Sequence, residues 1–532
     1  MSNLRFSPKG WVYVAGLGVV VGLALWAQAP ASIQFPASEM LSRPTANSVM
    51  VSAMADAPVE VYFEYGADQT TLSARTKEAK AAANEVIKAL MGGLKGNTRY
   101  YYRMMYRPQG VKDWTERPVH SFMTQRAPGS TFSFAITSDS HVNILLGNSR
   151  IWRQTLDDIA ADKPDFLFDL GDTFAMDNVT TFEGADQAYL YQRPFFGIVG
   201  ASAPVFLALG NHEEEEGWHL DDVPNEAESK PVMGANARKK YFPNPVPDKF
   251  YSGNKDPQKH LTGDHLREDY YAFEWGDALF IAIDPFWYSM TKPFMSNLGG
   301  GENFEPGSGD RWDWTLGRAQ YDWLNRTLQS SHAKYKFMFA HHGTGGTDDY
   351  IRAGAYGADY NEWGGLDTDG KTNSFAKHRP GWPKTVEQVL VDGHLTAFFH
   401  GHDHQYVYEI RDGIVYQEAP MAADARYSAG FNEYSEDNPM TKKKLPNTGY
   451  LRVTVSPSDT KVDYVMSVAP AAEVAAAAPN NNKGKAGDGK AKGDGKGKGK
   501  GKTNGADGTT REPIGKNGEV VYSYSMAPYS PK

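Results

Sequence analysis

Five short apolar runs in the middle of the chain, each followed at once by Asp, Asn or His, constrain the fold most. The runs cover residues 132–137, 165–170, 204–209, 335–340 and 396–399. Because they are apolar without alternation, they predict strands covered on both faces, as in α/β architecture. Helix-compatible stretches at 150–161 and 316–328 lie between them. We therefore expect an α/β fold in which helices flank the strands.

The polar residues after these runs follow a fixed order. The segments read D-S-H from Asp139, G-D from Gly171, G-N-H-E from Gly210, H-H from His341 and H-G-H-D-H from His400. Sites in α/β sheets form outside the carboxyl ends of strands, so the five ends can converge. Imidazole and carboxylate groups suit borderline-to-hard divalent or trivalent metals. Alternate residues of an extended segment point the same way, so the Asp and His of D-S-H can face one metal.

This ordered set of motifs, over about residues 131–406, resembles the calcineurin-like metallophosphoesterase superfamily, which includes purple acid phosphatases and many phosphodiesterases. The resemblance implies a β-sandwich flanked by helices that carries two divalent or trivalent ions, such as Mn, Fe or Zn. Carried over by motif, the ligands of one ion are Asp139, His141 and His404, those of the other are Asn211, His341 and His402, and Asp172 bridges the two. The family pattern selects the first His of the H-H pair, which leaves His342 to contact substrate or a ligand.

The resemblance also implies a mechanism. A two-metal site orients the phosphoryl oxygens and lowers the pKa of a bound water or hydroxide, which attacks phosphorus in line. His212, beside Asn211, is placed to protonate the leaving oxygen as general acid. Glu213 either orients that imidazole or belongs to a solvated run with the three glutamates that follow it. His400 and Asp403 are candidates for supporting the ligands, with simple strand and turn roles as the alternative.

Two positions depart from purple acid phosphatases. Those enzymes use a Tyr three residues after the bridging Asp, and that Tyr gives their colour, whereas this chain has Ala175. They also lack the His of the first motif, which is present here as His141. We therefore expect a colourless enzyme without a Tyr–iron pair.

The region 32–126 is expected to form a small all-β sandwich domain that precedes the catalytic domain. Short β-rich runs lie at 49–54, 59–65, 99–106 and 119–124, punctuated by Gly, Asn and Pro. The stretch 74–90 is helix-compatible and does not fit this pattern. The segment 94–102, with three consecutive tyrosines, resembles the turn entering a late strand of fibronectin type III modules, where a Tyr locks the corner. The whole region also resembles the sandwich before the catalytic domain of purple acid phosphatases.

Residues 1–31 are expected to direct export. Arg5 and Lys9 precede an apolar run at 11–27, and small residues follow, as in a secretory signal peptide. An uncleaved membrane anchor is the alternative, because the run is at the short limit for a membrane span. We expect a periplasmic or extracellular location, free or anchored through this segment.

The remaining domains are a catalytic domain at 127–470, a disordered Gly/Lys-rich insertion at 471–515 and a terminal strand at 516–532 that completes the catalytic domain. The insertion has too few apolar residues to offset the entropy of ordering. It is either a passive linker or a segment that contacts anionic surface polymers. The net charge of −9 argues against nucleic-acid binding, and the absence of Cys excludes disulfides and thiolate metal sites.

Together these features predict an exported dinuclear-metal phosphoesterase that acts on a small phosphate ester. A phosphomonoesterase is favoured over a phosphodiesterase, although both classes share the same ligands. The alternative from another class is a surface polyanion-binding protein with an idle metal site. A protein phosphatase fits less well with export and the leading β-sandwich.

Overall fold

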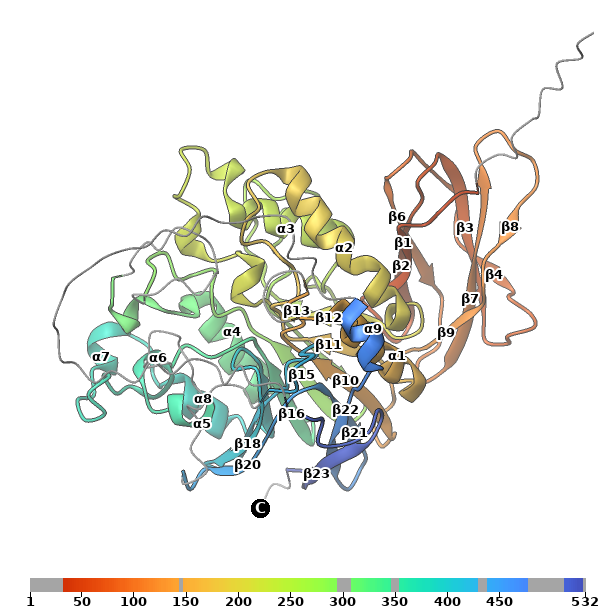
Figure 1. The fold of residues 1–532 in the computed structure, drawn as a ribbon. Helices are drawn as coiled ribbons and strands as arrows, with labels where there is room; N and C mark the ends of the chain where they lie inside the picture. Colours follow the sequence, from red (N-terminus) through yellow and green to blue (C-terminus); the bar gives the residue numbers. More distant parts are fainter. Residues whose placement is uncertain are drawn as a thin grey trace, which may run out of the picture.

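The computed structural model describes residues 32–142, 147–293, 308–345, 354–428, 438–476 and 511–529 (Figure 1). The predicted export segment 1–31 and residues 477–510 of the predicted insertion lie outside the described residues.

Two sheets form the centre of the molecule. The first has six strands in the order β12 (Val205–Leu207), β11 (Leu167–Asp169), β10 (Phe132–Thr137), β21 (Gly449–Val455), β22 (Thr460–Met466) and β23 (Val520–Met526). The second has eight, in the order β13 (Ser252–Gly253), β14 (Tyr271–Trp275), β15 (Ala278–Ala282), β16 (Tyr335–Phe339), β17 (Ala397–His400), β19 (Ile414–Glu418), β18 (Tyr406–Arg411) and β20 (Thr441–Leu445). Strands β10, β11 and β12 pair in parallel, as do β15, β16, β17 and β19.

Aromatic side chains fill the space between the sheets. Phe168 of the first sheet stacks on Phe339 of the second with ring centroids 4.0 Å apart. Phe134 meets Phe280 edge to face at 5.2 Å. All four rings are fully buried, so the inner faces of both sheets form one core. The predicted α/β sandwich flanked by helices is confirmed.

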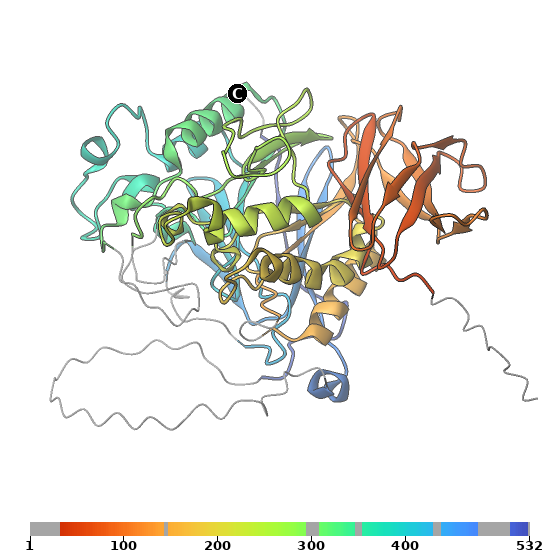
Figure 2. The same cartoon turned by 90° about the horizontal axis from the view of Figure 1, so that it is seen from above.

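Helices cover the outer faces. Helices α1 (Ser149–Asp162), α2 (Phe182–Gly200) and α3 (Lys230–Tyr241) pack beside the six-stranded sheet, where Trp152 and Leu156 join the main core (Figures 1 and 2). Helices α4 (Gly317–Ser330), α6 (Asn361–Gly364) and α8 (Val386–Asp392) form a second core on the outer face of the eight-stranded sheet. The remaining short helices are α5 (Gly354–Gly357), α7 (Phe375–His378), α9 (Ala471–Ala476), η1 (Asn211–Glu213), η2 (Gly217–His219), η3 (Glu226–Glu228) and η4 (Arg311–Asp313).

A separate antiparallel sandwich precedes these sheets. One sheet has the order β1 (Ala37–Ser42), β2 (Ser48–Met54), β6 (Val86–Gly92), and the other β4 (Ala74–Arg75), β3 (Val59–Gly66), β7 (Arg99–Pro108), β8 (Thr115–Glu116). Strands β5 (Ala79–Ala81) and β9 (His120–Met123) add to β3 and β7. The Tyr100 hydroxyl accepts the Lys95 N–H at 3.0 Å, across the corner where we expected a tyrosine lock.

The helix-compatible interpretation of residues 74–90 is wrong. This stretch contains β4, β5 and the start of β6 instead. Strand β6 pairs with β2 along its whole length, from Ser48–Gly92 to Met54–Val86. Pairing with neighbouring strands outweighs the weak helix propensity of a stretch rich in Ala and Lys.

Buried polar contacts fix the sandwich to the catalytic sheets. Arg193 of α2, which is fully buried, donates to the carbonyls of Ser38 and Tyr241 at 2.6 Å each and to the Ser52 hydroxyl at 3.1 Å. The Tyr102 hydroxyl donates to the Ala201 carbonyl at 2.7 Å. Because these bonds replace solvation that burial removes, they hold the two parts in one arrangement.

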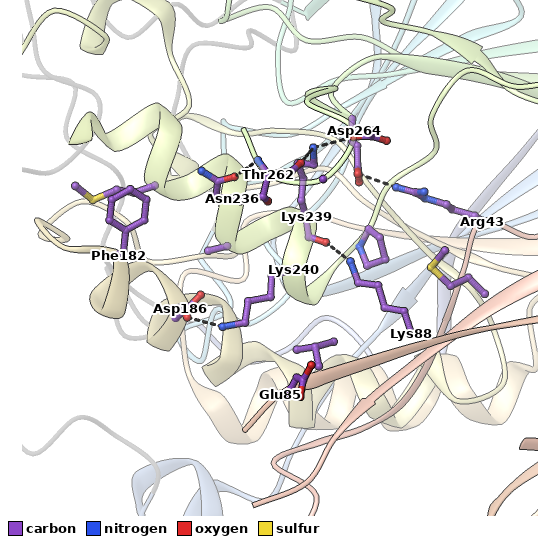
Figure 3. A pocket seen from close by; sticks show the side chains of 17 residues that line it. Arg43, Glu85, Lys88, Phe182, Asp186, Asn236, Lys239, Lys240, Thr262 and Asp264 are labelled. Atoms are coloured by element: carbon purple, nitrogen blue, oxygen red, sulfur yellow. Dashed lines mark hydrogen bonds and ion pairs between the residues drawn. The ribbon is translucent and has the colours of Figure 1, made fainter. Parts of the chain in front are cut away.

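A cavity of about 550 Å³ lies at this junction, between β6, α2 and α3 (Figure 3). Three of its cations form ion pairs within the lining: Lys240 with Asp186 at 2.6 Å, Lys239 with Asp264 at 3.0 Å and Arg43 with Glu268 at 2.8 Å. The fourth, Lys88, donates to the Lys239 carbonyl at 2.7 Å. The predicted metal ligands do not contribute to its lining. The cavity is therefore separate from the predicted site.

The end of the described chain returns to the six-stranded sheet. Strand β23 pairs antiparallel with β22, for example Val462 with Tyr524. Helix α9 occupies residues 471–476, within the range 471–515 for which we expected no structure. It is held by an Arg150–Glu473 ion pair at 2.5 Å and by the Asn148 side-chain amide, which donates to the Val474 carbonyl.

The other predicted domain boundaries stay predictions. Among the helices of the described ranges, none is long and apolar enough to cross a membrane.

Candidate metal centre

The ends of parallel strands from both central sheets meet at one edge of the sandwich. Asp139 and His141 follow β10, Asp172 follows β11 and Asn211 follows β12. From the second sheet, His341 follows β16, and His402 and His404 follow β17. All seven predicted ligands are buried, and six of them belong to groups whose ligand atoms lie within 4.8 Å of one another.

Asp139, His141 and His404 form the first group. The Nε2 atoms of the two imidazoles are 2.8 Å apart. Each lies 3.4 Å from Asp139 Oδ1. Three donor atoms that face one another at these distances fit around a single cation.

Asp172, His341 and His402 form the second group. His341 Nε2 lies 3.0 Å from Asp172 Oδ2 and 3.2 Å from His402 Nδ1. The same Asp172 oxygen lies 3.6 Å from His141 Nε2 of the first group. One carboxylate oxygen therefore faces both groups, which is the arrangement that a bridging ligand requires.

Backbone contacts orient these donors. His341 Nδ1 lies 3.0 Å from the Leu170 carbonyl, so this nitrogen carries the proton and Nε2 is directed at Asp172. The His402 N–H donates to Asp139 Oδ2 at 3.0 Å, which leaves Oδ1 for the imidazoles. Within the described ranges, no hydrogen-bond donor satisfies this fully buried Oδ1. An acceptor of this kind fits a cation.

The electrostatics of the site also favour a cation. Burial alone would raise the pKa values of Asp139 and Asp172, but the surrounding histidines outweigh it and lower both well below the usual range. Burial lowers the pKa of His141 to about 4. The carboxylates are therefore ionised and this imidazole is neutral, as metal binding requires. Asp172 and Asp139 overcome burial at His341 and raise its pKa to about 10, so this position attracts positive charge.

The backbone at the site differs from our expectation. We expected Asp139 and His141 to share a face of an extended segment, but both have positive φ, 55° and 45°. Asp172, His402 and His404 also have positive φ, at 55°, 84° and 56°. This conformation costs roughly 1–2 kcal/mol for a residue with a Cβ atom. Five residues with positive φ, in the three loops after β10, β11 and β17, and not strand alternation, aim these side chains at the site.

Gly171 and Gly210 allow two of these turns to touch. A Cβ on Gly171, where φ is 97°, would lie 2.3 Å from the Gly210 nitrogen. A Cβ on Gly210 would lie 2.3 Å from Asp172 Oδ1. The loops after β11 and β12 therefore approach each other at a distance that side chains would prevent.

His212 is held beside the two groups. Its backbone N–H donates to Asp172 Oδ1 at 2.9 Å. Its ring packs edge to face on the His141 ring, with centroids 4.9 Å apart. Its Nδ1 lies 2.6 Å from Asp177 Oδ1. Burial lowers the pKa of His212, but Asp172 and Asp177 outweigh it and raise the pKa to about 9. The imidazole is thus protonated and directs Nε2 toward the site, 3.9 Å from Asp172 Oδ2.

Both sequence-based interpretations of Glu213 are wrong. It does not orient His212, because Asp177 does, and the run Glu213–Glu216 is buried and not solvated. Its carboxylate accepts four backbone N–H groups at 2.6–3.0 Å, from Gly210, Asp172, Thr173 and Phe174. Glu213 thereby ties the loop that carries the bridging carboxylate to the loop after β12.

The other candidate residues surround the second group. The His342 ring packs against the donor His402 with centroids 4.6 Å apart, so it contacts a ligand as one of the two expected roles required. Its ring also packs against Phe286 and Trp314, at 5.0 and 4.8 Å. His400 Nδ1 contacts the Glu418 carboxyl group, and Glu418 also accepts the Asp403 backbone N–H at 3.0 Å. Burial lowers the pKa of His400 to about 3, so this imidazole is neutral. Asp177 and Glu418 were missed because neither belongs to a motif and each lies at least 15 residues along the chain from its partner.

Comparisons with known proteins agree with this geometry. The family profile for calcineurin-like phosphoesterases matches residues 132–406. A comparison with curated protein sequences finds no match. Among solved structures, "Structure of PhoD" is similar with a TM-score of 0.58 at 17% identity, covering 83% of this chain and 88% of that chain. Purple acid phosphatase PPD1 from yellow lupin (Lupinus luteus) seeds is similar with a TM-score of 0.52 at 14% identity, covering 81% and 72%. The chain belongs to the calcineurin-like metallophosphoesterase family and is a metal-dependent phosphoesterase with a His/Asp site suited to a dinuclear metal centre.

Proposed function

We propose that this chain hydrolyses a small phosphate ester, with a phosphate monoester as the favoured substrate. The observation that carries the proposal is the single oxygen, Asp172 Oδ2, that faces one donor group at 3.6 Å and the other at 3.0 Å. Asp139, His141 and His404 would hold one ion, Asn211, His341 and His402 would hold the other, and Asp172 would be shared between them. When bound, such ions would supply Lewis-acid chemistry, that is, polarisation of the phosphoryl oxygens and a lowered pKa for a nucleophilic water.

His212 is the proposed general acid. Departure of an alkoxide from phosphorus is slow unless a proton reaches the leaving oxygen in the transition state. The imidazole is charged, lies beside Asp172 and is held on its far nitrogen by Asp177. Nε2 is therefore the atom that donates, and Asp177 stabilises the imidazolium before the transfer.

The metals are proposed to be Mn, Fe, Zn or similar ions. Ala175 occupies the position three residues after Asp172, so no phenolate is available there for a charge-transfer pair with iron. We therefore expect the iron-loaded protein to be colourless. A purple absorption band in the iron-loaded protein would contradict this expectation.

We further propose that the protein acts outside the cytoplasm, on the strength of the basic, apolar and small residues of segment 1–31. Fractionation of cells that express the full chain tests this. We expect to find the protein in the periplasm, in the medium or on the outer face of the membrane, and confinement to the cytoplasm would contradict this proposal.

Contact of the Lys/Gly-rich tract with anionic polymers is a proposal that rests on the composition of the tract.

Hydrolysis of p-nitrophenyl phosphate and of the bis-ester tests the substrate class. The proposal predicts that a chelated sample is inactive and that refilling with a single metal restores turnover, with the monoester preferred. Preference for the bis-ester would make the protein a phosphodiesterase. No turnover of either ester with any metal would favour the polyanion-binding alternative.

A further inference from the structure

A second set of metal-ligand side chains lies in the segment that follows the general acid. Glu214, Glu216 and His219 each place one ligand atom within 4.8 Å of the others. The two glutamates are buried and the His is partly buried. This set shares no residue with the dinuclear site.

The imidazole of this set is oriented in the way metal-binding histidines are. His219 Nδ1 lies 2.6 Å from Asp222 Oδ2, and Nε2 lies 3.6 Å from Glu214 Oε2. A carboxylate on one ring nitrogen fixes the tautomer and raises the basicity of the other nitrogen. Asp222 therefore leaves Nε2 as an acceptor directed at the two glutamates.

The carboxylate of Glu216 is buried and incompletely hydrogen-bonded. Its side chain is 3% exposed, and its Oε2 has no hydrogen-bond partner within the described ranges. An unpaired buried carboxylate oxygen is costly unless a cation or proton satisfies it. Burial, reinforced by Glu214, raises the pKa of Glu216 well above its ordinary value.

The cation already present does not complete this set. Lys230 Nζ lies 3.2 Å from Glu214 Oε2, but it is also bonded to the Asp177 carbonyl at 2.6 Å. No ion pair joins Glu216 to Lys230 or to any other described cation. The two buried carboxylates of the set are therefore accompanied by a single ammonium, which is partly exposed and, of the two, bound to Glu214 alone.

We propose that Glu214, Glu216 and His219 form a third metal site that binds a divalent cation, separate from the dinuclear centre. Two carboxylates and one imidazole suit Mn²⁺ or Zn²⁺ better than Ca²⁺ or Mg²⁺, which prefer oxygen ligands alone. The ion would satisfy the buried oxygen of Glu216 that lacks a hydrogen-bond partner.

A chain of contacts connects this third site to the general acid, His212. Lys230 contacts Glu214 with the same ammonium that bonds the Asp177 carbonyl, and the Asp177 carboxylate holds His212. A cation at the third site therefore fixes Glu214 and, through Lys230, the segment that orients the imidazole. Its role is structural, since its ligands form a group apart from the donors of the dinuclear site within the described ranges.

Metal content tests the proposal without reference to activity. Wild type, Glu216→Gln, His219→Gln and Asp221→Asn are stripped with a chelator, refilled with Mn²⁺ or with Zn²⁺, freed of excess ion and measured by elemental analysis. Asp221 is an exposed neighbouring carboxylate outside the set, so its variant is the matched control. Wild type and control are expected to retain one metal equivalent per chain more than the two site variants.

Equal metal content in all four proteins, with either ion, would overturn the third site. If Glu216→Gln fails to fold, His219→Gln decides alone, because its side chain is partly exposed and its loss is tolerated better. An inactive protein that still shows the one-equivalent difference would contradict the proposed function and leave the third site standing.

Discussion

Asp172 is the residue on which the two donor groups depend, because its Oδ2 faces both. Asp172→Asn keeps the shape of the side chain but removes its negative charge and replaces one carboxylate oxygen with an NH₂ group, which does not bind a cation. We expect kcat on p-nitrophenyl phosphate to fall by about 10³-fold or more, since metal stabilisation of transition-state charge contributes several kcal/mol. Asp157→Asn, on the exposed face of α1, serves as the control and should keep full activity. Full activity of Asp172→Asn would show that this carboxylate does not bridge.

Asp177 is a positioning residue whose effect should pass entirely through His212. Removing the general acid is expected to lower kcat by about 10²–10⁴-fold, more for an alkyl phosphate than for the nitrophenyl ester, whose leaving group needs less protonation. Asp177→Asn should lower kcat in the same substrate order with little change in KM. The double variant with His212→Ala should be no slower than His212→Ala alone. Additive losses in that cycle would mean that Asp177 acts elsewhere.

The sequence predicted the metal-donor residues better than the residues that hold those donors in place. The motifs after the apolar runs identified every donor of the two groups, because metal chemistry limits which side chains can occur there. Glu213 was misread because a run of four acidic residues normally faces solvent. The four buried backbone N–H groups that it accepts belong partly to a loop about 40 residues earlier, a contact that no local pattern reveals.

At the scale of elements, the loops after β11 and β12 act as one unit because Glu213 joins them. Each carboxylate oxygen of Glu213 accepts hydrogen bonds from two backbone N–H groups. In Glu213→Gln, an NH₂ group would replace one of these oxygens and leave its two N–H groups without an acceptor. Leaving such groups unpaired should lower the free energy of unfolding by ~1–3 kcal/mol and weaken metal retention. Chemical denaturation with and without metal measures this. Glu226→Gln, on an exposed turn, is the control, and equal stability of the two variants would contradict the anchoring role.

Element prediction succeeded where strands are buried on both faces. The run 335–340 corresponds to β16 (Tyr335–Phe339), because a short continuous apolar segment between helices has few alternatives. It failed at 74–90, where the chain forms sandwich strands that are partly exposed and rich in Ala and Lys. Their conformation is set by partners β2 and β3, which local propensity does not describe.

At the scale of the whole molecule, the leading sandwich and the catalytic sheets should unfold together. Arg193 satisfies carbonyls from both parts, so Arg193→Met leaves buried acceptors unpaired at the junction. We expect it to lower the free energy of unfolding by at least ~2 kcal/mol. Arg153→Met on the exposed face of α1 should change it by less than ~0.5 kcal/mol. Thermal unfolding that separates into two transitions in the wild type would contradict a single cooperative unit.

The most direct test of the account is metal-dependent hydrolysis by the full chain. The protein is stripped by chelation, refilled with Mn²⁺, Fe or Zn²⁺ singly, and assayed on p-nitrophenyl phosphate beside Asp172→Asn. We expect no turnover after stripping, recovery on refilling, and no comparable recovery in the variant, because the bridging oxygen is the feature that both ions would share. Turnover that survives stripping, or that Asp172→Asn recovers in full, would contradict a dinuclear metal phosphoesterase.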